Sequence, residues 1–282
     1  MIEIIILVTV AVLTVGSLTD LRTREVPDWL NYGLIFTAFF FRLIYALLGR
    51  DADILVQGIL GFAIFAGIAY ALFYLGQFGG GDAKMLMGLG MLWGFRPSWD
   101  SLMARFGVAV LATGALYGLF WSVYLAGKHK KAFLRQWSQL MDRKGVKLAK
   151  AMLILVSLII IVLGAVMPGQ TLSFSLAILA LMIIITFYLW LFVKAVENSA
   201  MLKRTAPESL REGDWIAEEV KVDGTYICGP KDLGIDKEQI KTLLRLKKKS
   251  KIKEVLVKEG IPFIPSFLLA FLAVLASFSF TF

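Results

Sequence analysis

Two aspartates lie at the ends of apolar segments in the first third of this chain. Asp20 closes the first segment, and Asp82 follows three glycines, Gly79, Gly80 and Gly81, directly before another apolar run. Ionisable residues within membrane segments are costly and commonly serve a function. Paired carboxyl groups can hydrolyse a peptide bond when one activates a water and the other, protonated, polarises the carbonyl. The two acids therefore predict aspartic protease chemistry at a membrane edge.

Such a pair must share one proton, because two like charges held close together cannot both ionise cheaply. The pair then titrates as a unit. If Asp82 begins a helix, the free N–H groups and the positive end of the helix dipole favour its ionised form. We therefore expect Asp82 to be the base and Asp20 the acid. Gly79 to Gly81 have no Cβ, and we expect positive φ angles there that let a substrate backbone approach; the alternative is a flexible turn.

Other charged residues near these acids have competing interpretations. Glu25 and Asp28 share the loop with Asp20, but Asp28 follows a proline at a helix start, where N-capping is the expected role. Lys84 lies two residues after Asp82. It could steady that carboxylate or extend to the membrane interface, and we favour the interface.

The chain lacks the residues that other protease mechanisms require. A zinc protease of the H-E-x-x-H kind needs two histidines, and the chain contains only His129. Serine chemistry needs an activating base, and His129 lies in a charged loop where a solvated side chain is expected. Cys228 is the only cysteine, so no intrachain disulfide and no cysteine-based zinc site can form. We predict no metal and no cofactor.

The composition predicts an integral membrane protein. Hydrophobic residues make up 58% of the chain, and the mean hydropathy is +0.75. A spanning helix needs about 20 mostly apolar residues. The first segment has no basic start and no small-residue cleavage site, so we expect it to remain as a helix. The eight candidate segments are 2–19, 29–48, 54–76, 83–95, 101–126, 148–167, 171–194 and 261–282.

Basic residues predict the orientation, because Lys and Arg accumulate in cytoplasmic loops. Residues 128–150 contain eight of them and one acid, Asp142. Two crossings separate Asp20 from Asp82, so both acids are expected at the cytoplasmic face. In the same loop, apolar residues recur at helical spacing and predict an amphipathic helix, either on anionic lipid or packed under a cytosolic domain. The net charge of +9 fits this pattern, and no nucleic-acid partner is expected.

The predicted fold is an all-α polytopic membrane protein, with about 6–8 transmembrane helices and a small cytosolic α+β domain before the last helix. Residues 1–194 would form the membrane domain, 195–260 the cytosolic domain and 261–282 a final membrane helix. Within 195–260, we expect a hairpin from Trp215–Val222 to Gly224–Cys228, a helix over Lys237–Lys249 capped by Asp236 and Gln239, and a last strand at Ile252–Lys258.

Three stretches carry a family resemblance. They are Asp20 through Val26-Pro27-Asp28, the run Gly79-Gly80-Gly81-Asp82-Ala83-Lys84, and the closing Glu259-Gly260-Ile261-Pro262-Phe263-Ile264-Pro265. With them the chain resembles an archaeal type IV prepilin or preflagellin peptidase of the GxGD aspartyl protease group. The resemblance implies that Asp20 and Asp82 are the catalytic pair. It also implies about six membrane segments, so 148–167 and 171–194 would be an added pair.

The resemblance further implies a multi-pass protein of the cell membrane that removes short basic leader peptides from archaellin or type IV pilin-like precursors at the cytoplasmic face. Besides these precursors, the lipid bilayer would be its partner. One alternative is a presenilin-like or signal-peptide-peptidase-like protease, but Thr19 stands where that branch has Tyr, and its Pro-Ala-Leu motif is missing. Another is a proton-coupled transporter, although no internal repeat is visible. An inactive scaffold is a third.

Overall fold

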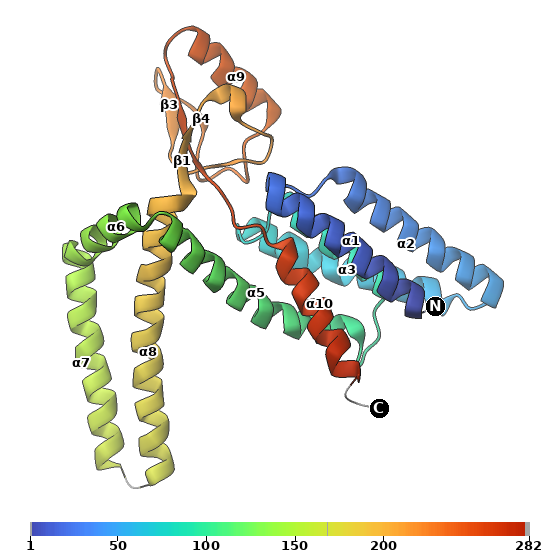
Figure 1. The fold of residues 1–282 in the computed structure, drawn as a ribbon, viewed down its shortest axis with the longest axis horizontal. Helices are drawn as coiled ribbons and strands as arrows, with labels where there is room; N and C mark the ends of the chain where they lie inside the picture. The colour runs from blue at the N-terminus through green and yellow to red at the C-terminus, as the bar shows by residue number, and fades with distance from the viewer. Residues whose placement is uncertain (1, 168, 280–282) are drawn as a thin grey trace. The chain divides into compact units, whose positions relative to one another are not determined.

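The structure, a computed structural model, describes residues 2–167 and 169–279 of the chain. Within these ranges the chain is mostly helical, with short strands between α8 and α10 (Figure 1). The helices are α1 (Ile2–Thr23), α2 (Asp28–Gly49), α3 (Asp53–Tyr74), α4 (Gly80–Trp93), α5 (Leu102–Lys128), α6 (Lys130–Asp142), α7 (Lys144–Val166), α8 (Gln170–Val196), α9 (Lys237–Lys248) and α10 (Ile264–Ser279). The strands are β1 (Leu202–Thr205), β2 (Trp215–Ile216), β3 (Val220–Val222), β4 (Thr225–Cys228) and β5 (Val255–Lys258).

All eight predicted apolar segments contain a helix, which confirms the predicted fold class. In the described part of the chain, six helices are long and apolar enough to cross a membrane, namely α1, α2, α3, α5, α7 and α8. The other two are shorter, since α4 has 14 residues and α10 has 16. α4 starts at Gly80 rather than at the predicted residue 83, because two of the glycines form its first turn. The predicted last segment ends at 282, and its residues 280–282 lie outside the described ranges.

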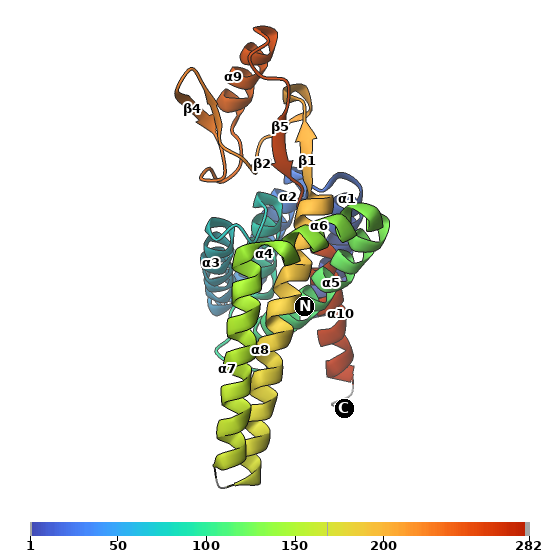
Figure 2. The ribbon, with the colours of Figure 1, turned by 90° about the vertical axis from the view of Figure 1, so that its left-hand side faces the viewer.

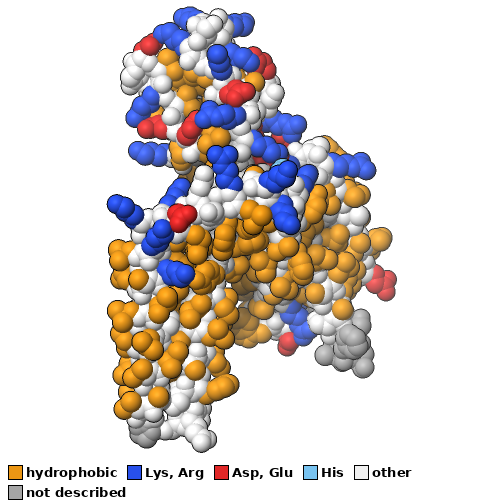
Figure 3. Space-filling model, turned by 60° about the vertical axis from the view of Figure 1, so that its left-hand side comes forward, with side chains coloured by type: hydrophobic (Ala, Val, Ile, Leu, Met, Phe, Trp, Pro, Cys, Tyr) orange, Lys and Arg blue, Asp and Glu red, His pale blue; other side chains and the backbone are white. Residues whose placement is uncertain are grey.

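The surfaces of the long helices are suited to lipid. Large apolar side chains are widely exposed on them, for example Leu111 of α5 at 75% and Phe174 of α8 at 70%. Exposed apolar patches of this extent mark a surface that contacts lipid or protein rather than water. Figure 3 shows hydrophobic side chains covering the helices on one face, whereas charged side chains gather over the domain that carries the strands. The chain is therefore a multi-pass membrane protein.

The chain divides into two compact units, residues 1–120 with 204–282, and residues 121–203. In the first unit, α4 packs against α2 and α3, while α10 packs against α1 (Figure 1). The backbones of α3 and α4 touch, since a Cβ on Gly61 would lie 2.3 Å from the carbonyl oxygen of Gly90. Any side chain at Gly61 would force the two helices apart. The short α4 is thus held inside a bundle of longer helices.

A buried arginine caps the C-terminal end of α4. Arg42 of α2 is only 3% exposed, and its guanidinium donates hydrogen bonds to the carbonyl oxygens of Met91, at 2.7 Å, and Leu92, at 3.1 Å. The last carbonyls of a helix have no partner within the helix and carry its negative dipole end. A buried cation is therefore stabilised there, and it ties α2 to the end of α4.

The strands form a small α+β domain in the predicted place. β5 pairs antiparallel with β2, and the sheet order is β1-β5-β2 (Figure 2). β3 and β4 form a hairpin whose turn residues, Asp223 and Gly224, both have positive φ. α9 begins with the predicted capping box, in which Asp236 and Gln239 each accept from the other's backbone N–H. The core of the domain consists of Leu210, Ile216, Cys228, Ile235, Leu243, Val255 and Val257.

Two local predictions in this domain need correction. The predicted hairpin is right for β3 and β4 but wrong for Trp215 and Ile216, which pair with β5 instead, because this register buries Ile216 in the core. The predicted last strand starts at Val255 rather than Ile252. Residues up to Lys251 are still bonded back to α9, since Lys251 N–H donates to the carbonyl of Leu246.

The second unit is an antiparallel pair of apolar helices, α7 and α8, preceded by the short α6. α6 confirms the predicted helix in the basic loop. Its apolar side chains do not all face outward, because Phe133 packs edge-on against Phe192 of α8 with ring centroids 5.5 Å apart, and Leu140 is only 3% exposed. α8 therefore covers part of the face that was predicted to lie on lipid or under the cytosolic domain.

We predict that the single thiol is unreactive in the folded protein. Burial raises the pKa of Cys228 from the ordinary 9.0 to about 11, so almost no thiolate is present at neutral pH. Iodoacetamide should modify native protein far more slowly than denaturant-unfolded protein. Because the unfolded thiol loses its proton first, the domain should also lose stability as the pH rises from 9.0 to about 11. Cys228→Ala should lack that component, and rapid alkylation of native protein at neutral pH would contradict the burial.

Candidate active site

Asp20 lies in the last turn of α1, and its side chain is only 4% exposed. Its Oδ2 accepts a hydrogen bond from the backbone N–H of Ile264 at 3.0 Å. Ile264 is the first residue of α10, so this N–H is one of the donors that a helix start leaves without a partner inside the helix. The first predicted acid is thus held by the start of the last helix.

Asp82 lies in the first turn of α4, and its side chain is half-buried. Its Oδ2 accepts from the backbone N–H of Gly79 at 3.1 Å. This contact is half of a capping box, because Gly79 has no side chain with which to return a bond. The residue before α4 therefore fixes the direction of the Asp82 side chain through its backbone N–H.

The two acids lie close enough for their charges to interact. Tight packing brings their helices together one turn before Asp20, at Gly16. A Cβ there would lie 3.1 Å from the side chain of Met85 in α4 and 3.2 Å from that of Ile264 in α10. The small residue lets α1, α4 and α10 converge at the level of the acids.

The helix dipole does not distinguish the two carboxyl groups, contrary to our expectation from the sequence. Asp82 lies at the N-terminal end of α4, and Asp20 receives an N–H from the N-terminal end of α10. Each acid lies beside one positive helix end, and Asp20 is hydrogen-bonded by the backbone of Phe263 as well as by that of Ile264. The sequence pattern pointed to α4 alone, because the contact between Asp20 and α10 joins positions far apart in the chain. Both carboxyl groups therefore lie where a helix dipole favours the ionised form.

The glycines before Asp82 do not have the predicted positive φ angles. Gly79 is extended, with φ −74°, and Gly80 and Gly81 are the first residues of α4. Gly81 is needed for a different reason, since a Cβ there would lie 3.1 Å from the Cβ of Val26. A Cβ on Gly80 would meet nothing within 4 Å. The run is therefore a helix start packed against the beginning of α2, with an open approach at Gly80.

Lys84 and Asp28 contact each other rather than filling the roles expected from the sequence. Lys84 Nζ lies 2.6 Å from Asp28 Oδ1 and 5.0 Å from the centroid of the Tyr32 ring. Asp28 is the first residue of α2, the N-cap position belongs to Pro27, and no side chain caps this helix. The predicted N-cap role of Asp28 is therefore wrong. Lys84 joins the first turns of α4 and α2, and it neither contacts Asp82 nor extends freely.

Other residues near Asp20 were missed by the sequence reasoning. Tyr117 of α5 lies close enough to interact with the charges of Asp20 and Arg24. Arg24 ends α1 with a positive φ of 61°, a conformation usually given to glycine, and donates to the carbonyl of Gly260 at 3.1 Å. Tyr117 has no distinguishing sequence signal. Gly260 and Ile264 belong to the closing stretch that carries the family resemblance, and that stretch was the available clue.

The α+β domain reaches the end of α1 through one arginine. Arg211 lies 2.9 Å from the carboxylate of Glu25, and it also donates to the carbonyl of Thr23 at 3.2 Å. Glu25 therefore has a structural partner outside the acid pair. The same domain continues from β5 into Gly260 and then into α10, so it contacts the Asp20 region by two routes.

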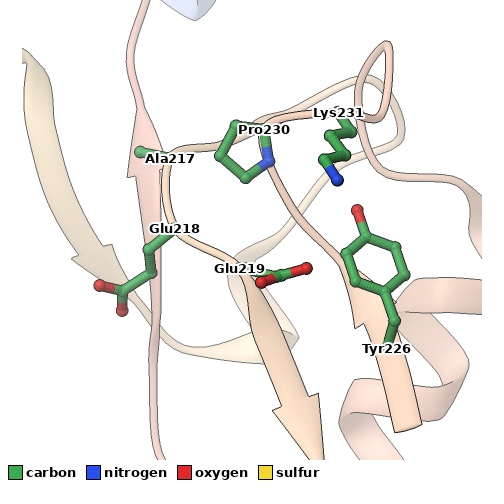
Figure 4. A pocket seen from close by; sticks show the side chains of 6 residues that line it. All are labelled: Ala217, Glu218, Glu219, Tyr226, Pro230 and Lys231. Atoms are coloured by element: carbon green, nitrogen blue, oxygen red, sulfur yellow. The ribbon is translucent and has the colours of Figure 1, made fainter.

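A separate pocket lies within the α+β domain and contains none of the predicted site residues (Figure 4). Its volume is about 330 Å³. In Figure 4, Tyr226, Lys231 and Glu219 point toward its middle, whereas Glu218 points away. Across the described residues, no group of three or more His, Cys, Asp and Glu side chains could hold a metal ion. The acid pair at α1 and α4 remains the candidate active site.

Comparison with known proteins places the similarity over this acid pair. Residues 7–127 match the model of the type IV leader peptidase family, and they include Asp20 and Asp82. The preflagellin peptidases of Methanocaldococcus jannaschii and Methanococcus maripaludis are 31% and 38% identical to this chain, each over 80 residues. Each of these matches covers 28% of this chain and 34% of the relative, so the chain spans about a third of the relatives' length. No solved structure matches. The resemblance drawn from the sequence is confirmed for residues 7–127.

We predict that Arg211 restrains the end of α1. In Arg211→Gln, backbone amides of residues 20–26 should exchange hydrogen faster, because the contacts with Thr23 and Glu25 are lost. The pair is more than half exposed, so the loss of global stability should be about 1 kcal/mol or less. Hydrogen exchange with mass spectrometry measures the local effect. The matched control is Lys237→Gln, which breaks an exposed pair with Glu212 in the same domain. Equal exchange at 20–26 in both variants would contradict the restraint.

Proposed function

We propose, from the match of residues 7–127 to the type IV leader peptidase family, that this chain is a membrane aspartic endopeptidase of the GxGD type. Its substrates would be archaellin or type IV pilin-like precursors, from which it removes the short basic leader peptide. The observation that carries the proposal is the close packing of α1 against α4 at Gly16, which brings together the helix ends that carry Asp20 and Asp82 within the matched region. Both relatives are named preflagellin peptidases.

The proposed reaction needs only the two carboxyl groups and a water. One carboxylate removes a proton from the water, which attacks the carbonyl carbon of the scissile peptide. The other, protonated, hydrogen-bonds to the carbonyl oxygen and then donates its proton to the leaving amine. The N–H groups of Ile264 and Gly79 hold the two carboxyl groups in direction without using a side chain. Such prior positioning reduces the reorganisation that the reaction requires.

The position of the acids supports cleavage at a membrane surface. Asp20 is in the last turn of α1 and Asp82 in the first turn of α4, with α2 and α3 between them in the chain. Both acids therefore fall at helix ends on the same side of the bilayer. The basic stretch 128–150 supports assignment of that side to the cytoplasm. We propose that the precursor's apolar segment stays in the bilayer while its basic leader is cut off at the cytoplasmic face of the cell membrane.

Separate replacement of the two acids tests this function. A pilin-like or archaellin precursor is incubated with the wild type, Asp20→Asn and Asp82→Asn in membranes or detergent, with a metal chelator present. The wild type should release the leader peptide, and each variant should lose activity by roughly 10²- to 10⁴-fold, because neither can complete the proton transfers. Mass spectrometry of the mature N-terminus identifies the cleaved bond.

The control for this experiment is Asp51→Asn, which alters an exposed acid at the opposite end of α2 and should leave cleavage unchanged. Cleavage that survives in either Asp20→Asn or Asp82→Asn would rule out the acid pair. Cleavage abolished by the chelator would rule out the metal-free reaction. A folded wild type that cleaves none of several archaellin and pilin precursors would overturn the proposed substrate class.

A further inference from the structure

A buried side chain of α2 holds the peptide group directly before Asp82. Asn31 is completely buried, with 0% exposure, and its Nδ2 donates to the carbonyl oxygen of Gly81 at 3.2 Å. Gly81 also fits against Val26, which precedes α2. Residues at the start of α2 therefore contact the glycine run through both packing and a hydrogen bond. No sequence pattern marked Asn31, because its partner is 50 positions away.

The hydrogen bonding of Asn31 is incomplete. Across the described residues, its Oδ1 has no hydrogen-bond partner, although the atom is fully buried. A buried polar group without a partner lowers stability, whereas an apolar residue of the same shape avoids that cost. Gly81 is in the first turn of α4, so its carbonyl also accepts the helical bond from four residues on. Leucine at position 31 should therefore be tolerated, and stability alone does not explain the asparagine.

We propose that Asn31 is a positioning residue of the peptidase. By holding the Gly81 peptide group, it fixes the first turn of α4 and the direction in which Asp82 faces Asp20. The inference rests on the proposed function, since it assigns Asn31 a part in the same reaction. Asn31 does not touch the reacting atoms in this scheme. It acts only through the backbone of Gly81.

The same helix offers a matched control. Arg42 also lies on α2, is buried, and donates to backbone carbonyls of α4, but at the opposite end of that helix, at Met91 and Leu92. Arg42→Lys keeps the charge and loses the two-pronged contact. It should lower stability without changing the geometry near Asp82. Asn31→Leu should change the geometry near Asp82 without lowering stability.

The experiment compares wild type, Asn31→Leu, Asn31→Gln and Arg42→Lys in three measurements on the full chain in membranes. They are thermal stability, kcat and KM for precursor cleavage, and hydrogen exchange of residues 79–84. Asn31→Leu should keep the wild-type stability and KM, lower kcat on the order of 10- to 100-fold, and speed exchange at 79–84. Asn31→Gln, which keeps an amide donor, should recover part of the rate. Arg42→Lys should melt earlier but keep kcat and the exchange at 79–84.

Each outcome decides the inference. Faster exchange at 79–84 in Asn31→Leu, with kcat lowered at a temperature where the variant is folded, supports positioning. Unchanged exchange overturns it, even if kcat falls, because the effect would not pass through Gly81. Unchanged kcat with faster exchange also overturns it. If Arg42→Lys lost as much kcat as Asn31→Leu, the lower kcat of Asn31→Leu would be explained by lost stability, and positioning would be overturned. If the wild type cleaves no precursor, the proposed function fails by itself, and the exchange data still decide whether Asn31 holds Gly81.

Discussion

The hydrogen bond from Ile264 N–H to the Asp20 carboxylate is the interaction on which the arrangement of this protein depends. It brings the start of α10 to the end of α1, so that two stretches 244 positions apart build one site. A buried carboxyl group without a donor would be costly, and the start of α10 supplies the donor without any further side chain. The packing of α1, α4 and α10 around Gly16 then follows from the need to keep this contact close.

The sequence could predict those parts of the fold that depend on local pattern. Apolar length predicted the six helices of the described residues that are long enough to cross a membrane, and the Asp236-to-Gln239 spacing predicted the cap of α9. The glycine run and its aspartate predicted where the second acid lies. Each of these features is contained within one short stretch of chain. For that reason a single sequence contained enough information to predict them.

The sequence could not predict contacts between distant stretches. Asp28 was expected to cap its own helix, but Lys84 on another helix competes for the same carboxylate. Gly79 to Gly81 were expected to have positive φ, yet the position of Val26 supplies a different reason for Gly81. Asn31 and Tyr117 carry no local signal, because each acts through a partner on another helix. The sequence therefore identified the two acids of the candidate site. The residues that support them could be identified only from the three-dimensional structure.

The link between Asp20 and α10 also has a consequence for biosynthesis. Asp20 is made long before its backbone donor, which belongs to residue 264 and follows the whole α+β domain. A nascent chain inserted into the membrane up to α8 already contains both acids, but it lacks the helix start that orients one of them. The order of synthesis thus delays completion of the site until the α+β domain has been made and α10 has reached α1.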